Sequence, residues 1–495
     1  MCNFSCSILD NDPASLGLGK QKERSKEHVK KILKNFSYTF VSNVVSFCIS
    51  ALVTFIVPKK LGVESYGYFQ LYLFYVSYVG FFHFGWADGV FLRYGGAYYD
   101  QLDRAKFSAQ FWLYSAFELT LGAVIGISAW FYARPEEKAL VLCLVGVAVF
   151  LLLPRTFLQY VLQCTNRMRE YAFLTVIEKI VYFVLVLVFL LGETRQFAFL
   201  IAADLFGKSC ALVYAAYQCR DIILTRMDPL EKALEEVKQN ISVGSKLMIS
   251  NIAGMLIIGI VRLSIEHQWD VATFGKISLT MSVSNMLMVV IRAVAMVTFP
   301  MLRRTDNEKL APLYNTMRVC LMIPLLGMMV AYYPVKAILS VWLPQYAESL
   351  RYMAILFPMC IFESKMSMLI ETYLKALRKE RWLLLVNVVT VSVSLLVTIS
   401  TVFLLQNLNL AILSIVMILA FRCVVAELLL SKVLDVTVIK DIVLELLLTT
   451  IFVAFNWFGG GTIGLLAYLL SYLVYLFLKR NELRAIWDRV FLKKQ

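Results

Sequence analysis

The chain consists of long apolar runs separated by short polar stretches along almost its whole length. Each run has about 20 residues, the length that an α-helix needs to cross a hydrocarbon layer roughly 30 Å thick. Because backbone polar groups in lipid must be satisfied within the segment, these runs are predicted to be helices. We expect about 14 membrane-spanning helices, at residues 36–58, 66–84, 108–132, 139–162, 171–191, 196–217, 241–263, 273–300, 315–340, 349–376, 382–404, 409–430, 441–457 and 460–478.

The composition agrees with an all-α polytopic membrane protein. Of 495 residues, 60% are hydrophobic and 17% are charged, and the mean hydropathy is +0.72. A soluble globular chain has about a quarter of its residues charged, so that class is excluded. Most of the ten cysteines lie inside apolar runs, with no CxxC pattern and no Cys/His cluster. We therefore expect neither a disulfide framework nor a bound metal.

The distribution of Lys and Arg predicts the orientation. The net charge is +14. If both ends are cytoplasmic, about 32 Lys and Arg fall in cytoplasmic segments and about 6 in outer loops. Cytoplasmic loops are normally enriched in these residues, so the sequence predicts both termini inside. The charge is thereby explained without a nucleic-acid partner.

The longest loop divides the first twelve predicted helices into two sets of six, and its segment DPLEKALEEVKQ is predicted to form an amphipathic surface helix. Asn35-Phe36-Ser37 and Asn240-Ile241-Ser242 open the first and seventh helices, 205 residues apart, which indicates two related halves. The predicted organisation is a cytoplasmic basic tail (1–35), an N-lobe of helices 1–6 (36–217), a cytoplasmic linker (218–240), a C-lobe of helices 7–12 (241–430), helices 13 and 14 (431–478) and a second cytoplasmic basic tail (479–495).

The short loops argue against an enzyme. None has room for a soluble catalytic domain, and no GxxxxGK[ST] motif for ATP binding occurs. A membrane glycosyltransferase or polymerase tends to carry sizeable outer loops with carboxylates or arginines, whereas the outer loops here are nearly bare. We expect no enzymatic activity and no cofactor.

A polar hairpin at Phe81–Gly96 carries the most specific motif. It contains Gly85, Asp88, Gly89 and Arg93 among aromatic residues, and it follows a Leu-Gly…Tyr-Gly element at residues 61–67. These two elements resemble the Wzx-type oligosaccharide flippases, the polysaccharide biosynthesis proteins of the MOP exporter superfamily, which also includes MATE transporters. Asp88 and Arg93 are interpreted as fixing the hairpin and shaping an inner gate; contact with a substrate head group is the alternative.

The resemblance implies a bacterial cytoplasmic-membrane protein with a cationic central cavity that opens alternately to either side. The implied substrate is an undecaprenyl-pyrophosphate-linked oligosaccharide, flipped to the outer leaflet for surface polysaccharide such as O-antigen or capsule. Membrane lipids, a polysaccharide polymerase and glycosyltransferases are implied as partners. The alternative on the same fold is a MATE-like cation-coupled antiporter of drugs or other small molecules, although these usually have 12 helices.

Basic residues within the spans are candidates for binding the pyrophosphate. Lys246 and Arg262 are 16 residues apart on helix 7, and Lys276 and Arg292 are 16 apart on helix 8. At 1.5 Å per residue each pair spans about 24 Å. Because the two helices are antiparallel, they are predicted to form two cationic rungs, each a pair of basic residues at one level of the membrane: Lys246 with Arg292, and Arg262 with Lys276. Arginine can grip a phosphate bidentately. Lys365 is a further candidate. The alternative is that cations near helix ends extend to the interface.

Acidic residues within the spans have other candidate roles. Asp204 and Lys208 are four residues apart with the acid first, which predicts a structural ion pair. Glu363 lies near the middle of helix 10. It is a candidate to carry a coupling proton, and pairing with a cation of the cavity is the alternative.

Overall fold

We analysed a computed structural model of the chain, which describes residues 18–303 and 307–484. Side chains are described from Ser37 onward, except Thr39 and most of the segment 287–308, where Met288 and Leu302 are included. All regular structure in this part of the chain is helical. The chain divides after Ile249 into two compact units, which are described separately.

The expected all-α membrane fold is confirmed. In the described residues, 12 helices are long and apolar enough to cross a membrane. The other two expected spans, 66–84 and 273–300, fall on α2 (Val63–Val79) and α10 (Val271–Arg303). The count of about 14 is therefore approximate, but every predicted span coincides with a helix.

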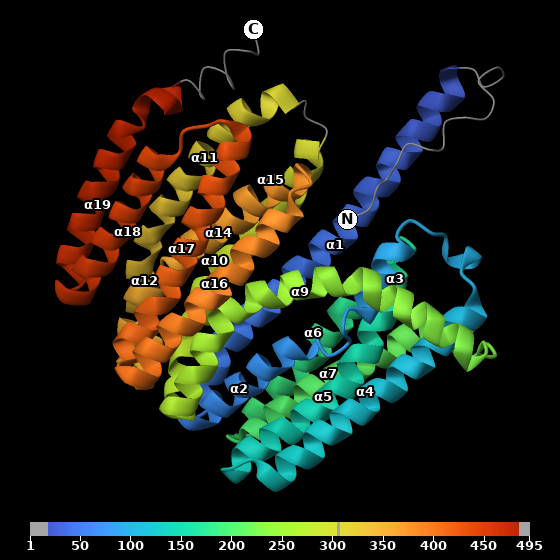
Figure 1. Cartoon of the computed structure of the whole chain (residues 1–495). Coiled ribbons are helices and arrows are strands. Elements are labelled where there is room, and N and C mark those ends of the chain that lie inside the picture. The colour runs from blue at the N-terminus through green and yellow to red at the C-terminus, as the bar shows by residue number, and fades with distance from the viewer. Residues whose placement is uncertain (1–17, 304–306, 485–495) are drawn as a thin grey trace. The chain divides into compact units, whose positions relative to one another are not determined.

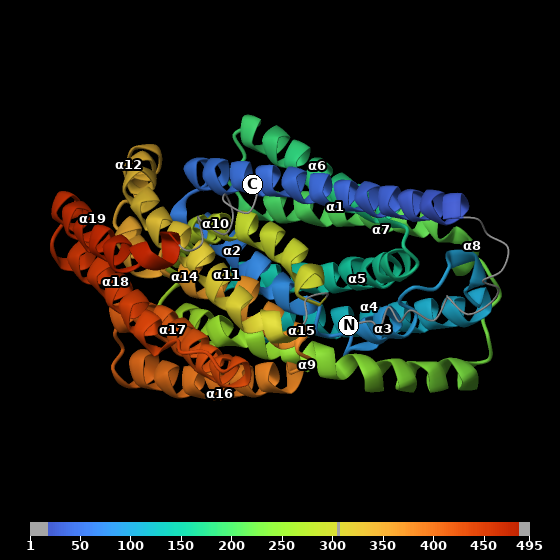
Figure 2. The same ribbon diagram turned by 90° about the horizontal axis from the view of Figure 1, so that it is seen from above.

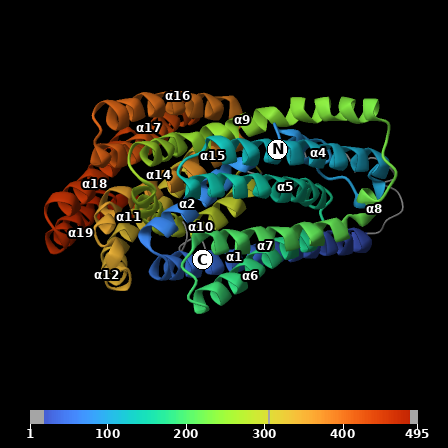
Figure 3. The same cartoon turned by 90° about the horizontal axis from the view of Figure 1, so that it is seen from below.

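The first unit is a bundle of antiparallel helices (Figure 1). α4 packs beside α5 and α6 beside α7, as Figure 3 also shows. Its elements are α1 (Leu18–Lys60), α2, α3 (Trp86–Arg93), α4 (Arg104–Tyr132), α5 (Glu136–Cys164), α6 (Met168–Leu191), α7 (Phe197–Gln218), α8 (Arg220–Ile223) and the first part of α9 (Leu230–Gln268).

Glycines bring α4 and α5 into close contact. A Cβ atom at Gly122 would lie 2.5 Å from the carbonyl oxygen of Gly146, and the reverse contact is equally short. Only glycine permits two helix backbones to approach this closely. The contact leaves no room for water between the helices at mid-span, and Glu118 lies one turn before Gly122 on α4.

The predicted surface helix and the seventh span are one continuous helix. α9 runs from Leu230 to Gln268, and the boundary between the two units falls inside it, after Ile249. No proline interrupts these 39 residues, so nothing in the backbone ends the helix at residue 240. The lobes and linker predicted from the sequence, 36–217, 218–240 and 241–430, stay a prediction.

The second unit is built around the segment Ser349–Ala376, which is the most buried of the candidate spans. A π-helical turn at Lys365–Ile370 interrupts this segment. The helices are α10, α11 (Asn307–Gly327), α12 (Tyr332–Trp342), α13 (Met353–Leu356), α14 (Met359–Ser364), α15 (Glu371–Ala376), α16 (Glu380–Thr398), α17 (Leu408–Leu434), α18 (Ile439–Phe458) and α19 (Gly461–Leu478).

The last two helices pack onto the rest of the second unit. Figure 2 shows α18 and α19 side by side, in agreement with their contacts. The hydroxyl of Tyr468 donates to the carbonyl of Leu326 at 2.6 Å, and that of Tyr472 donates to Ile323 at 2.8 Å. α19 therefore bonds to the backbone at the end of α11, where the following 3₁₀ turn begins.

Candidate functional site

The glycines of the hairpin motif bring α3 against the backbone of α9. Gly85 has φ of +84°, a conformation that glycine adopts without strain. A Cβ at Gly85 would overlap Ser245, and one at Gly89 would overlap the carbonyl of Asn240. Gly244 on α9 meets Gly85 in the same way. The motif glycines therefore form a helix contact that any side chain would push apart.

Arg93 ties the end of α3 to α9. Its Nη1 atom donates to Glu236 at 2.8 Å and to Asn240 at 2.6 Å, and its Nη2 atom donates to Gln239 at 2.6 Å. Lys106 at the start of α4 also donates to Glu236, at 2.9 Å. In the described structure the hydrogen-bond partners of the Arg93 guanidinium thus lie on α9. The contacts of Asp88 are with other residues.

Asp88 is buried, with 6% of its surface exposed. The hydroxyl of Tyr160 on α5 donates to it at 3.4 Å, and Nε2 of His83 lies 3.9 Å away. Nδ1 of His83 accepts from the backbone N–H of Gly85 at 3.0 Å, which leaves the proton of a neutral ring on Nε2, facing the carboxyl. Burial raises the pKa of Asp88 to about 6.

Deeper in the first unit, two ion pairs and one isolated acid lie between helices. Arg155 on α5 pairs with Glu178 on α6. Lys208 pairs with Asp204 one turn earlier on α7, and Asp204 also accepts from the hydroxyl of Tyr72 at 2.7 Å. The isolated acid is Glu118, whose two oxygens have no hydrogen-bond partner in the described part of the chain.

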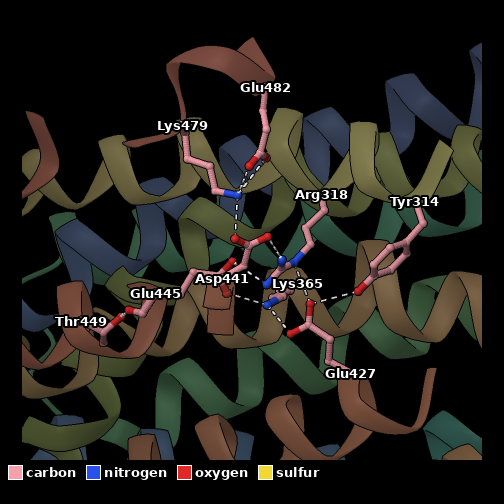
Figure 4. A network of polar contacts seen from close by, with 9 residues as sticks. All are labelled: Tyr314, Arg318, Lys365, Glu427, Asp441, Glu445, Thr449, Lys479 and Glu482. Carbon is pink, nitrogen blue, oxygen red and sulfur yellow. Dashed lines mark hydrogen bonds and ion pairs between the residues drawn. The ribbon is translucent and has the colours of Figure 1, made fainter. Parts of the chain in front are cut away.

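The largest polar network lies in the second unit and joins α11, the π-helical turn and α17 to α18 (Figure 4). Lys365 lies 2.5 Å from Glu427 and 2.5 Å from Glu445. Arg318 lies 2.7 Å from Glu427 and 3.0 Å from Glu445. Tyr314 donates to Glu427 at 3.0 Å. Two buried cations and two buried carboxylates therefore neutralise each other, which is the condition for stable burial of charge.

The network continues toward the end of α19. Asp441, at the start of α18, pairs with Arg318 and lies 2.6 Å from Lys479. Lys479 also binds Glu482 at 2.7 Å, and Glu445 accepts at its backbone carbonyl from Thr449. These contacts fix both ends of the α18–α19 hairpin to the core of the second unit.

A second cluster surrounds Arg422 on α17. Its Nε atom donates to Asn387 at 3.0 Å, Nη1 to Glu363 at 3.4 Å and Nη2 to Glu371 at 3.2 Å. Lys375 binds Glu371 at 2.9 Å from the other side. Glu363 therefore faces a cation of its own unit in this structure.

The candidate cations lie in different surroundings. Arg262 donates to Ser278 at 2.9 Å, and its guanidinium lies 5.1 Å from the ring centre of Phe274. These two residues flank Lys276, which is half-buried and lies 3.6 Å from Glu348. Arg262 and Lys276 thus occur at one level of α9 and α10.

The other three candidate cations, Lys246, Arg292 and Lys365, are each described separately. Lys246 is exposed and belongs to the first unit. Arg292 lies on α10, but its side chain is outside the described residues. Lys365 is 2% exposed, and its ammonium group is engaged by two carboxylates, so a phosphate could reach it only if these contacts broke.

Sequence reasoning missed four charged members of the large network, Arg318, Asp441, Lys479 and Glu482. They lie at or near span ends, where charges are usually solvated. The sequence nevertheless contained a signal for this pairing. The start of helix 9, the end of helix 12 and the start of helix 13 lie on the same predicted side of the membrane. Charges of both signs at that one level favour pairing between neighbouring helices.

The fold resembles that of known membrane transport proteins. A lipid II flippase, MurJ, in an inward closed conformation matches with a TM-score of 0.62 and 13% identity, covering 90% of this chain and 99% of its own. A MATE-family multidrug resistance transporter of the MOP superfamily, facing inward, matches with a TM-score of 0.55 and 14% identity, covering 78% and 96%. No protein-family model matches the sequence, and no curated protein does either.

These similarities identify the fold. The chain is a nearly all-helical membrane protein with the architecture found in MurJ and in MATE transporters. At 13–14% identity the likeness extends to the fold and not to the site residues.

Proposed function

We propose that this protein flips an undecaprenyl-pyrophosphate-linked oligosaccharide from the inner to the outer leaflet of a bacterial cytoplasmic membrane. Movement would occur by alternating access through a cationic central cavity, in the service of surface polysaccharide synthesis. The observation that carries the proposal is the fold of a lipid II flippase, matched over 90% of this chain and 99% of that protein.

Two features of the chain support a lipid-linked substrate over a small drug. The MATE-family transporter covers 78% of this chain, less than the 90% covered by MurJ. The hairpin from Gly85 to Arg93 carries the motif that resembles oligosaccharide flippases. A MATE-like antiporter remains the second candidate, since the same fold supports that activity in the matched transporter.

We infer that Arg262 and Lys276 bind the pyrophosphate at one level of the cavity, with Lys246 and Arg292 as the second rung. Arginine and lysine are suited to a dianionic head group because their hydrogen bonds to phosphate are charge-assisted. Lys365 we assign to the buried network instead. The Lys and Arg bias of the loops supports both termini in the cytoplasm.

The proposal can be tested in proteoliposomes that contain the purified protein and a fluorescently labelled undecaprenyl-pyrophosphate oligosaccharide. We expect lectin-accessible sugar to appear on the opposite face only when protein is present. Arg262→Ala should slow its appearance at least tenfold, whereas Lys432→Ala, which removes an exposed cation at the end of α17, should not.

A parallel assay separates the two candidate functions. Vesicles loaded with ethidium, a cationic dye, report antiport activity under an ion gradient. Dye efflux without movement of the lipid-linked sugar would replace the flippase proposal by the MATE-like alternative. In cells, loss of the gene should abolish surface polysaccharide and leave lipid-linked repeats on the inner leaflet.

A further inference from the structure

Glu118 is a carboxyl group at the middle of a membrane-spanning helix. It lies 14 residues from each end of α4, which runs from Arg104 to Tyr132, so it is about 21 Å from either end at 1.5 Å per residue. It has no exposed surface, and neither of its oxygens has a hydrogen-bond partner in the described structure.

An ionised carboxylate cannot remain at such a position without compensation. Burial of a lone charge in a medium of low dielectric constant costs several kcal/mol or more, even after the protein relaxes. Other buried acids of the described structure, Glu178 and Glu427 among them, have a cation in contact. Glu118 has no cation in contact among the described residues, so it is stable in the membrane only when it carries a proton.

The groups around Glu118 are uncharged or already neutralised. On its own helix the hydroxyl of Tyr114 and Nε2 of Gln110 also have no hydrogen-bond partner in the part of the chain that the structure describes. On α5, Arg155 is paired with Glu178 of α6. The Arg104–Asp221 pair between α4 and α8 and the Lys106–Glu236 pair lie at the start of α4, about three to four turns from Glu118.

A series of polar side chains leads from Glu118 to the hairpin. Tyr114 lies one turn before Glu118 on the same face of α4. The ring of Tyr114 contacts Trp86, two residues before Asp88, with centres 5.2 Å apart. Tyr160 donates to Asp88 at 3.4 Å.

We propose that Glu118 is a proton-binding site of the first unit, which exchanges its proton with the hairpin through Tyr114, Tyr160 and Asp88. On release, the O–H bond of the Glu118 carboxyl breaks. Tyr114 makes no hydrogen bond to Glu118 or Tyr160 in the described structure, so its hydroxyl must first move into contact with them. Each phenol then accepts a proton and passes on its own, and the carboxylate of Asp88 forms the final O–H bond before transfer to water. The pKa of Asp88, raised by burial to about 6, suits a group that gains and loses a proton near neutrality.

Proton binding can be tested without a transport substrate, by infrared spectroscopy of the purified protein in lipid nanodiscs. At pH 7 we expect a C=O band from a protonated carboxyl in an apolar environment. Glu118→Gln should remove the band and leave thermal stability unchanged, since glutamine has the shape of the neutral acid. The matched control Glu363→Gln should keep it, because that carboxylate faces Arg422. A band that is absent from the unmodified protein, or retained in Glu118→Gln, would overturn the site.

The route is tested by the rate at which this band shifts when H₂O is replaced by D₂O. Tyr160→Phe removes one hydroxyl of the series and should slow the shift at least tenfold, while Tyr217→Phe, an exposed tyrosine of α7, should not. An unchanged rate in Tyr160→Phe would overturn the route.

Coupling of this proton to transport rests on the proposed function. Under an imposed pH gradient, the unmodified protein should move the lipid-linked sugar faster than without one, and Glu118→Gln should lose that dependence. If sugar movement depended equally on the pH gradient in the unmodified protein and in Glu118→Gln, coupling of this proton to transport would be overturned. If no sugar moves in any sample, the proposed function fails, while the infrared result still decides the proton site.

Discussion

Replacement of Lys365 by methionine is the sharpest test of the buried network in the second unit. Lys365 supplies one of the two cations between Glu427 and Glu445, and the side chains of these two acids are at most 6% exposed. Methionine keeps the length and apolar character of the side chain but removes the charge. Arg318 alone would then face both carboxylates together with Asp441.

The expected cost follows from the geometry. Removal of one partner from a buried ion pair costs about 3–5 kcal/mol, because the remaining charge stays desolvated without compensation. Lys375→Met is the matched control in the same segment. Lys375 also contacts a carboxylate, Glu371, but its side chain is 31% exposed, and a pair of this kind contributes about 0–1 kcal/mol.

The measurement is unfolding in detergent, followed by tryptophan fluorescence and by the loss of the monodisperse peak on size-exclusion chromatography. Lys365→Met should unfold at clearly lower temperature or denaturant concentration than Lys375→Met. The double variant Lys365→Met/Glu445→Gln, which removes one charge of each sign, should recover part of the loss. If the two single variants unfold within about 1 kcal/mol of each other, the reasoning on buried charge is refuted.

Two further predictions concern the hairpin. Gly89→Ala should destabilise the first unit by at least about 2 kcal/mol, because the new Cβ would overlap the backbone of Asn240, whereas Gly62→Ala, which has nothing within 4 Å, should cost little in the same unfolding assay. Equal effects would contradict the proposed contact. Burial raises the pKa of Asp88 from 3.8 to about 6, so the unfolded chain releases this proton first and folding stability falls as pH rises between about 4 and 6. Asp88→Asn should remove this loss of folding stability, which amounts to up to about 3 kcal/mol. The burial argument would be contradicted if the difference in stability between Asp88→Asn and the unmodified protein stayed the same from pH 4 to pH 7.

Much of the fold could be predicted from the sequence, because lipid imposes a simple rule on it. Each apolar run of about 20 residues must be a helix, and all predicted spans coincide with helices. The helix from Leu230 to Gln268 was harder to predict. Its first part is amphipathic and its second part apolar, so the pattern indicates two elements, although the backbone continues without a break.

The hairpin makes contacts that could not be predicted from the sequence. Gly85, Gly89 and Arg93 are conspicuous in an apolar chain, and their composition indicates a tight structural element. That the glycines meet the backbone of α9, and that Arg93 bonds to Glu236, depends on segments more than 140 residues apart. A sequence pattern records which face of a helix is apolar, not which distant helix that face meets.

By itself, the sequence determined the class of protein, the positions of the spans and the charges they contain, because hydrocarbon selects for length and hydropathy residue by residue. Only the tertiary structure decided the partners of those charges. Lys365, a candidate for phosphate binding from sequence, lies between two carboxylates, while Glu118 has no hydrogen-bond partner among the described residues. An ion pair requires the rotation and level of two helices to agree within a few ångströms, and those quantities are set by packing between segments far apart in the chain.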